Sequence, residues 1–252
     1  MKIPDIVLDA LLADASLSFT QRAFYLFSSA YQTDSGSELA EKLGLSASTV
    51  FRHCRYLSER EWMRISGSRR KFCPIALIPH NCQKKMAEAL EVAFDLAPNR
   101  GEFLMKRNLD LWIRSDDFVD NARPDFLVSP VKDRPLEYDR YYLARVAFEF
   151  NGPQHFGKTE IYPSEEELRE TKARDLIKKA LSAQANVRLI TVVAEDLEHM
   201  AFEKLLPDDL PRNRVDKDAP YCKTLARICA NYAAKAARSS SNARPVKPDV
   251  RK

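Results

Sequence analysis

The sequence lacks the long apolar run that a membrane-spanning helix needs. Its longest apolar segment, Val187–Val193, covers about seven residues even when Arg188 and Thr191 are tolerated, whereas a helix that crosses a bilayer needs roughly 20. The first residues carry Asp5 and Asp9 and show no basic start followed by an apolar block, so we expect no secretory signal. We therefore expect no membrane as a partner.

Cysteine is scarce, and its spacing is irregular. The five cysteines are odd in number and none belongs to a CxxC pair: Cys54, Cys73, Cys82, Cys222 and Cys229. A disulfide framework and a zinc knuckle both need cysteines at regular spacings, so this pattern argues against both. Scattered, reduced thiols are typical of a cytoplasmic protein, and we expect that location.

The composition is that of an ordinary globular protein. Hydrophobic residues make up 45% and charged residues 30% of 252 residues, enough for two modest cores or one large core. The net charge of +4 is too small to identify a nucleic-acid-binding protein, but the basic residues are clustered at Arg52–Arg55, Arg69–Lys71, Lys84–Lys85 and from Lys235 onward. Such clusters fit a surface that meets a polyanion, although solvated surfaces also carry them.

The first part of the chain predicts helices separated by sharp breaks. Phe19–Tyr31 has apolar residues at helical spacing, and TDSG then interrupts the pattern. Ser37 is expected to cap a short helix, Glu38–Leu43, which Gly44 ends.

A third helix and a hairpin follow. Ser46 or Ser48 can cap the helix, which is expected to run to about Glu61. After it, RISGSRRKFCPIAL places two strand-like runs around a basic triplet, Arg69–Lys71. This pattern predicts a β-wing with cationic side chains at its tip.

The segment from Ser18 to Ile78 resembles the winged helix-turn-helix family of bacterial regulators and replication proteins. The resemblance is carried by Leu39, Ala40, Leu43, Gly44, Leu45, Ser46, Ser48, Val50 and Leu57. It implies double-stranded DNA as a partner, with the second helix in the major groove and the wing on phosphates. The residues expected to contact DNA are Ser46, Ser48, Arg52, His53, Arg55, Arg69, Arg70 and Lys71. The alternative is a three-helix protein-interaction or dimerisation domain with the same core.

The remaining segments predict an α/β layout. We expect a first domain over 1–78, a helical linker over 79–98, a second domain over 99–212, a helix over 213–237 and a disordered basic tail over 238–252. Within the second domain the expected order is a helix from Glu102 to about Ile113, strands Asp125–Val128, Leu136–Leu143 and Arg145–Asn151, helix Glu165–Ala185 and strand Val187–Val193.

The segment RPLEYDRYYLARVAFEFNGPQHF carries the sharpest chemical signal. Folding a hairpin at Leu143-Ala144 sets Asp139 nearly opposite Glu149, with both side chains on one face. Two carboxylates so close repel each other unless a proton or a cation lies between them. Mg²⁺ prefers hard oxygen ligands, so it is the natural cation here. A hairpin whose acids are merely solvated is the plainer alternative.

The second domain resembles the PD-(D/E)xK nuclease superfamily, in particular a branch with a G-x-Q-H signature related to the very short patch repair endonucleases. The resemblance covers about Arg100–Val193 and also includes Glu102, the RDxxK of Arg174–Lys178 and the strand VRLITV. It implies a restriction-endonuclease-like domain, a mixed central sheet flanked by helices.

The resemblance also implies a role for each matching residue. Asp139, Glu149 and the backbone carbonyl of Phe150 would bind Mg²⁺ or Mn²⁺. Gln154 and His155 would contact the phosphate or the attacking water at the edge of the site. Lys178, or Lys158, would supply a positive charge, and Glu102 would bind a second ion or orient a water.

Two departures from the family pattern bear on activity. The lysine of the motif falls at Asn151, which is neutral, so Gln154 and a lysine elsewhere would have to replace it. Asp125, in a literal Arg-Pro-Asp-Phe, is a second candidate for the metal-binding aspartate, but Asp139 has the better separation from Glu149 for one hairpin.

These observations favour a Mg²⁺-dependent endodeoxyribonuclease that hydrolyses phosphodiester bonds and is targeted by the winged helix. The alternative is a transcription or replication regulator whose degenerate nuclease fold only binds DNA. RNA cleavage, or nicking within a larger assembly, is not separated from these. Cutting both strands with one site per chain is compatible with a homodimer.

Overall fold

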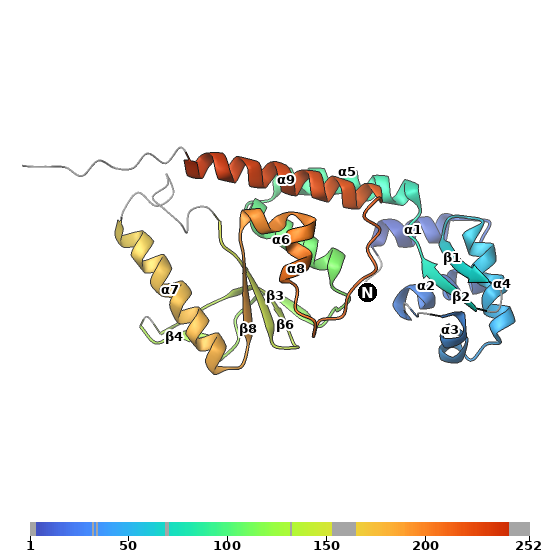
Figure 1. Cartoon of the computed structure of the whole chain (residues 1–252), viewed down its shortest axis with the longest axis horizontal. Helices are drawn as coiled ribbons and strands as arrows, with labels where there is room; N and C mark the ends of the chain where they lie inside the picture. The colour runs from blue at the N-terminus through green and yellow to red at the C-terminus, as the bar shows by residue number, and fades with distance from the viewer. Residues whose placement is uncertain are drawn as a thin grey trace, which may run out of the picture. The chain divides into compact units, whose positions relative to one another are not determined.

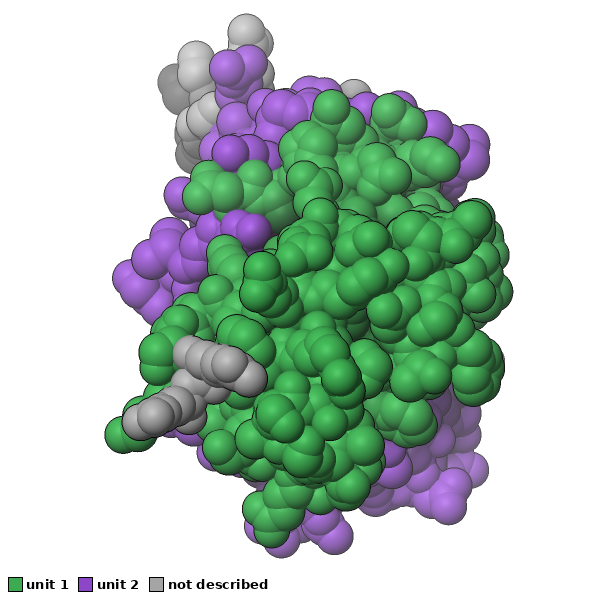
Figure 2. All heavy atoms as spheres, turned by 90° about the vertical axis from the view of Figure 1, so that its right-hand side faces the viewer, with its two compact units in different colours: residues 1–90, 218–221 green, residues 91–217, 222–252 purple. Residues whose placement is uncertain are grey.

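The computed structural model describes residues 4–31, 33, 35–68, 71–131, 133–152 and 165–241. It divides into two compact units, Met1–Leu90 with Asp218–Tyr221, and Glu91–Lys217 with Cys222–Lys252, which Figure 2 colours green and purple. The change from the first unit to the second falls within helix α5, His80–Leu96. None of the described helices is long and apolar enough to cross a membrane.

The first unit contains four helices and a hairpin among its described residues (Figure 1): α1 (Asp5–Ala13), α2 (Phe19–Tyr31), α3 (Gly36–Leu43), α4 (Ala47–Ser58), β1 (Met63–Ser68) and β2 (Lys71–Ala76). Its core is built from apolar side chains of every helix and of the hairpin, including Leu11, Phe24, Leu39, Val50, Leu57 and Met63. The strands pair antiparallel from Met63↔Ala76 to Ser68↔Lys71, so Arg69 and Arg70, which lie outside the described residues, occupy the connection. The predicted hairpin is therefore present.

The ends of α3 and α4 test the capping residues predicted from the sequence. Ser46 caps α4 by accepting a hydrogen bond from the Thr49 N–H at 3.2 Å, and Gly44 ends α3 in the left-handed region at φ 64°. The prediction that Ser37 caps α3 was wrong, because Ser35 accepts the hydrogen bond from the Glu38 N–H at 3.1 Å. The helix thus begins at Gly36.

Gly36 can occupy that position only because it has no side chain. A Cβ atom there would lie 2.1 Å from the ring of Phe72, which β2 contributes. Packing against β2, which lies far along the chain, therefore requires glycine at the first position of α3.

The second unit is built on a four-stranded sheet. Its described elements are α6 (Arg100–Trp112), β3 (Phe118–Ala122), β4 (Val128–Ser129), β5 (Arg134–Pro135), β6 (Tyr138–Tyr142), β7 (Val146–Phe150), α7 (Glu165–Gln184), β8 (Arg188–Val192), α8 (His199–Leu205) and α9 (Pro220–Ser241). The strand order is β3-β6-β7-β8, with β7 and β8 parallel and the other pairs antiparallel. The mixed α/β class predicted from the sequence is confirmed.

The edge strand of this sheet was not predicted. Asp125–Val128 was expected to be a strand, but the Leu127 N–H closes a turn onto the Pro124 carbonyl at 2.8 Å, and only Val128 enters the short strand β4. The real strand, Phe118–Ala122, was missed because its sequence FVDNA is short and does not alternate apolar with polar residues. It forms through pairing with β6 rather than through its own hydrophobic pattern.

The bounds of two other elements, β6 and α9, also differ from the prediction. Leu143 and Leu136 lie outside β6, and the Leu136 N–H instead donates to the Leu127 carbonyl at 2.7 Å. Helix α9 continues past its expected end at Ala237 to Ser241. The rest of the expected disordered tail, residues 242–252, lies outside the described residues.

Helices cover both faces of the sheet. The Phe150 ring packs against Gly101 of α6, where a Cβ atom would come within 2.0 Å of the ring. The neighbouring Glu149 bonds to Lys178 of α7. Because successive side chains of a strand point to opposite faces, α6 and α7 lie on opposite sides of β7. The functional residues of β7 therefore lie between two helices.

A buried arginine joins α6 to the sheet. The guanidinium of Arg140 on β6 is 1% exposed; it donates to both carboxylate oxygens of Asp120 on β3, at 2.7 and 3.0 Å, and to Asp110 on α6 at 2.5 Å. It also lies 3.9 Å from the centre of the Phe118 ring. These contacts satisfy a buried charge and hold the polar edge strand in place.

Removing this guanidinium should destabilise the second unit strongly. We expect Arg140→Ala to lower the free energy of unfolding by about 3 kcal/mol, because it breaks a buried ion pair and leaves two carboxylates without their partner. Arg123→Ala, which breaks an ion pair with Glu137 that is largely solvated, should cost less than about 1 kcal/mol. Urea denaturation measures both, and equal losses would contradict the role assigned to Arg140.

Candidate functional site

The hairpin of β6 and β7 brings two acids to one end of the sheet. Its register pairs Tyr142 with Val146, and the ladder continues to Arg140 and Phe148. The ladder ends at this pair, and Asp139 and Glu149 lie at the next position of each strand. The Phe150 N–H donates to Asp139 Oδ2, so the Asp139 carboxylate lies beside the backbone of β7, where the charge of Glu149 acts on it.

The environment of Asp139 favours its protonated form. Burial raises the pKa of this carboxyl to about 7, and the negative charges of Glu149 and Glu102 act in the same direction. The backbone N–H of Phe150, which donates to Asp139 Oδ2 at 2.7 Å, and the ammonium of Lys178 act against this shift. A carboxyl that titrates near neutral pH can exchange its proton for a metal ion.

Glu149 has one paired and one unpaired carboxylate oxygen. Lys178 of α7, 5% exposed, donates to Oε1. Oε2 is buried and has no hydrogen-bond partner among the described residues. Burial raises the pKa of Glu149 above its ordinary value, against the influence of Lys178. A buried, unpartnered carboxylate oxygen is costly unless a proton or a cation accompanies it.

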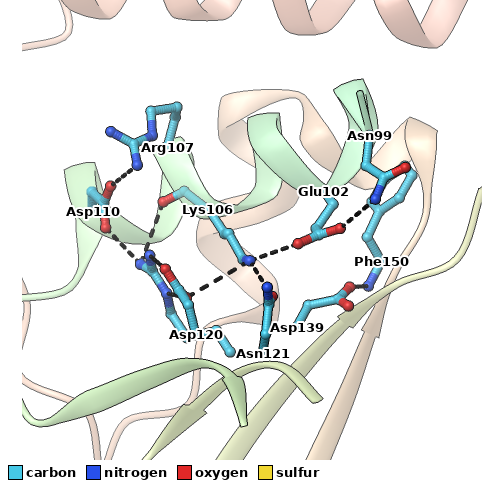
Figure 3. Close-up of polar contacts among 10 residues, drawn as sticks. Asn99, Glu102, Lys106, Arg107, Asp110, Asp120, Asn121, Asp139 and Phe150 are labelled. Atoms are coloured by element: carbon cyan, nitrogen blue, oxygen red, sulfur yellow. Dashed lines mark hydrogen bonds and ion pairs between the residues drawn. The ribbon is translucent and has the colours of Figure 1, made fainter. Parts of the chain in front are cut away.

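Glu102 reaches the same region from α6 (Figure 3). Its carboxylate accepts a hydrogen bond from Lys106 Nζ at 2.6 Å and one from Asn99 Nδ2 at 3.2 Å. Lys106 also donates to Asn121 Oδ1 at 2.8 Å, which links α6 to the edge strand. Lys106 was not identified from the sequence, although its i, i+4 spacing from Glu102 is the spacing of a helical ion pair.

The other predicted metal-site residues are distributed as follows. Asp125 lies exposed in the turn before β4, outside the four-stranded sheet, so the structure places Asp139 and not Asp125 beside Glu149. Gln154, His155 and Lys158 lie outside the described residues. Within the described part of the chain, no group of three or more His, Cys, Asp or Glu side chains could hold a metal ion.

Asn151 and Lys178 together bear on the missing lysine of the nuclease motif. The Asn151 backbone N–H donates to the Val192 carbonyl at 2.8 Å, and its side-chain oxygen is buried without a partner among the described residues. Lys178 brings an ammonium group to Glu149 from the facing helix. A positive charge is thus present beside the acids although the strand position itself is neutral.

In the first unit, α4 and the hairpin carry the predicted DNA contacts. Ser48, Arg52 and Arg55 are exposed on α4, and Lys71 is exposed at the start of β2. Arg55 pairs with Glu59 at 3.3 Å in a solvated contact, which is weak and easily exchanged. Arg69 and Arg70 lie outside the described residues.

Two residues predicted to contact DNA, His53 and Ser46, make contacts within the first unit instead. His53 was expected to point away from the core, but its half-buried ring stacks on Phe24 with centroids 5.0 Å apart, and burial lowers its pKa. The hydroxyl of Ser46 is engaged in the helix cap. The exposed cations of α4, rather than these two residues, are therefore the groups available to a polyanion.

The raised pKa of Asp139 predicts a pH-dependent stability. The folded pKa of about 7 exceeds the ordinary value of 3.8, so the stabilising contribution of this group is present at low pH and is lost as pH rises toward 7. We expect Asp139→Asn, without divalent cations, to unfold at a higher free energy than the parent at pH 8, by on the order of 4 kcal/mol at most.

Urea denaturation at pH 4, 6 and 8 measures this difference. We expect the difference in free energy of unfolding between variant and parent to increase with pH, because the asparagine cannot ionise. The control is Glu137→Gln on the same hairpin, whose carboxylate is largely solvated beside Arg123. A parent-to-variant difference that stays constant from pH 4 to 8 would show that Asp139 is not held in a proton-binding environment.

Comparison with known proteins adds nothing to this chemistry. No protein-family model matches the sequence, no characterised protein matches it, and no solved structure matches the fold. A family is therefore not shown for this chain, and a functional assignment depends on the geometry and charge of the described residues.

Proposed function

We propose that this protein is a Mg²⁺- or Mn²⁺-dependent endodeoxyribonuclease that is directed to double-stranded DNA by an N-terminal winged helix. The observation that carries the proposal is the crowding of Asp139 and Glu149 at one buried end of the hairpin, beside Lys178. One acid has a pKa near 7 and the other has a buried, unpartnered oxygen. This donor set fits a divalent cation that prefers hard oxygen ligands.

The arrangement of the second unit supports the proposal. Helix α6, strands β3, β6 and β7, helix α7 and strand β8 follow one another in the order expected from the resemblance to the PD-(D/E)xK nucleases. Asp139 of β6 and Glu149 of β7 are the positions at which this resemblance implies metal ligands. The short pair β4 and β5 is an insertion between β3 and β6.

The roles of the residues follow from their contacts. Asp139, Glu149 and the Phe150 carbonyl would hold the cation, which when bound polarises the phosphate and lowers the pKa of a bound water. The Phe150 N–H orients Asp139. Lys178 favours the charged form of Glu149, against the effect of burial, and would add a positive charge for the phosphate. Glu102 stays on the α6 side, held by Lys106.

The first unit supplies a surface for duplex DNA. Arg52 and Arg55 are exposed on α4, the helix that follows the turn at Gly44, and Lys71 stands at the base of the hairpin tip. Cations on a helix and on an adjacent wing are suited to the major groove and to phosphates. This unit would hold the duplex while the second unit cuts it.

Cleavage of supercoiled plasmid tests the enzymatic part. We expect nicking in Mg²⁺ or Mn²⁺ and none in EDTA. Glu149→Gln, Asp139→Asn and Lys178→Met should each slow nicking by about 100-fold or more, the scale on which single groups that stabilise a transition state contribute. Glu137→Gln and Lys179→Met are matched controls on the same hairpin and the same helix, and should nick at the parental rate.

The pattern of products and rates decides the outcome. Nicked circles before linear molecules would indicate that each chain cuts one strand, and that double-strand cleavage needs two copies. Equal nicking by the parent and by Glu149→Gln, or no nicking by the parent in either metal, would contradict the proposed activity.

One observation favours a second candidate, a DNA-binding protein that no longer cuts. The Lys178 ammonium already neutralises Glu149, and Asn151 stands at the motif's lysine position. Such a protein would bind duplex DNA with steep salt dependence but show no Mn²⁺ binding by calorimetry. Heat of Mn²⁺ binding that disappears in Glu149→Gln would exclude this candidate.

A further inference from the structure

Helix α9 carries a one-sided row of basic residues. Its 22 residues contain lysines and arginines but no aspartate or glutamate, whereas the whole chain has 40 basic and 36 acidic residues. The basic residues follow one another at spacings of about one or two helical turns, with Asn231 between them, and all are exposed: Lys223, Arg227, Lys235 and Arg238. We call this set the α9 basic row.

Such a row costs helix stability by itself. Like charges at i, i+4 repel by a few tenths of a kcal/mol, and helices exposed only to solvent commonly interleave acids with bases. From Lys223 to Arg238 the row is about 22 Å long at 1.5 Å per residue. That length matches roughly six base pairs of duplex. A polyanion that lies along α9 would complement the charge of this row.

A groove runs beside the row. It has a volume of about 470 Å³ and is lined by α5, α6 and α9, with Phe94, Arg100, Arg227, Tyr232 and Lys235 among its walls. The guanidinium of Arg100 lies 5.1 Å from the centre of the Phe94 ring, which holds it at the rim.

The groove also contains two acids, each close to an arginine. Glu91 pairs with Arg227, and Asp95 lies 3.9 Å from Arg100. All four side chains are about half exposed or more, so these pairs are weak and phosphate oxygens can compete for the arginines. Arg227 and Arg100 can therefore bind an anion in the groove although each lies close to an acid.

Direct contacts connect the groove to the carboxylate cluster. The Tyr232 ring of α9 packs on the Phe150 ring with centroids 6.1 Å apart. Both rings crowd Gly101 at the start of α6. The backbone N–H of Phe150 in turn donates to Asp139. A DNA strand lying along α9 would thus be separated from the Phe150–Asp139 hydrogen bond by the rings of Tyr232 and Phe150.

We propose that the α9 basic row and the adjoining groove bind the backbone of the DNA substrate and guide one strand to Asp139 and Glu149. The proposal rests on the proposed function, because it assigns the path of the substrate of that same site. It places a DNA-binding surface in the second unit, separate from the winged helix of the first.

The test compares DNA binding by the full-length chain and by a triple variant, Arg227→Ala, Lys235→Ala and Arg238→Ala. Fluorescence anisotropy with a labelled duplex in EDTA, at several salt concentrations, gives the slope of log affinity against log salt. Each lost phosphate contact lowers that slope by about 0.9, so we expect a slope smaller by roughly 2 to 3.

A second triple variant controls for net charge. Arg145→Ala, Arg188→Ala and Lys204→Ala remove the same number of exposed charges from other elements of the second unit. This control should keep the parental slope. Replacing the three residues of the row by the other basic residue (Arg227→Lys, Lys235→Arg, Arg238→Lys) should also keep it. A slope unchanged in the alanine variant of the row, or lowered equally in the control, would overturn the proposal.

Nicking assays separate this inference from the proposed activity. If the row guides the substrate, its alanine variant should raise KM for plasmid while kcat stays near the parental value. Nicking that requires Glu149 but has the same KM in the row variant and in the control would retain the nuclease and refute the path along α9. No nicking by the parent, together with a reduced salt slope in the row variant, would refute the nuclease and retain the DNA-binding surface.

Discussion

Two carboxylates forced together at a buried end of one hairpin set the physical constraint on which the second unit depends. The hydrogen bond from the Phe150 N–H holds the Asp139 carboxylate beside β7, the strand that carries Glu149. Burial and mutual repulsion disfavour two negative charges there. The chain offers partial compensation through the Phe150 N–H, the Lys178 ammonium and a proton on Asp139. One carboxylate oxygen of Glu149 still lacks a hydrogen-bond partner among the described residues. A bound cation would satisfy this buried oxygen, which is the chemical argument for a cation site here.

The surrounding structure holds these groups in place from both faces of the sheet. On one face, Gly101 permits α6 to lie directly on Phe150, and the buried Arg140 ties α6 to β3 and β6. On the other face, the Tyr138 hydroxyl lies 2.5 Å from Ser182 Oγ, which donates to the Lys178 carbonyl at 2.6 Å. Tyr138, next to Asp139, is thus connected to Lys178 through Ser182. These hydrogen bonds fix the position of α7 against β6 beside the two acids.

The two units would share the work of binding DNA. In the first unit the exposed cations lie on α4 and at the base of the hairpin, where they suit groove and phosphate contacts. In the second unit, α9 supplies a longer row of positive charge beside the acids. Contacts of the first kind can select a duplex, whereas contacts of the second kind place its backbone for chemistry. A modest net charge of +4 is compatible with the proposed binding, because the basic residues are concentrated in a few places.

The sequence by itself determined the features that depend on neighbours along the chain. A tight turn between β6 and β7 brings Asp139 and Glu149 to the same end of one hairpin, and Gly44 ends a helix because it accepts a positive φ. Only the tertiary structure decided the rest. The ring of Phe72 leaves room only for glycine at the start of α3, and Arg140 and β6 hold an edge strand that is too short to be recognised from its sequence. His53 turned out to stack on Phe24. In each case the deciding atoms come from a segment distant in sequence, whose position no local pattern encodes.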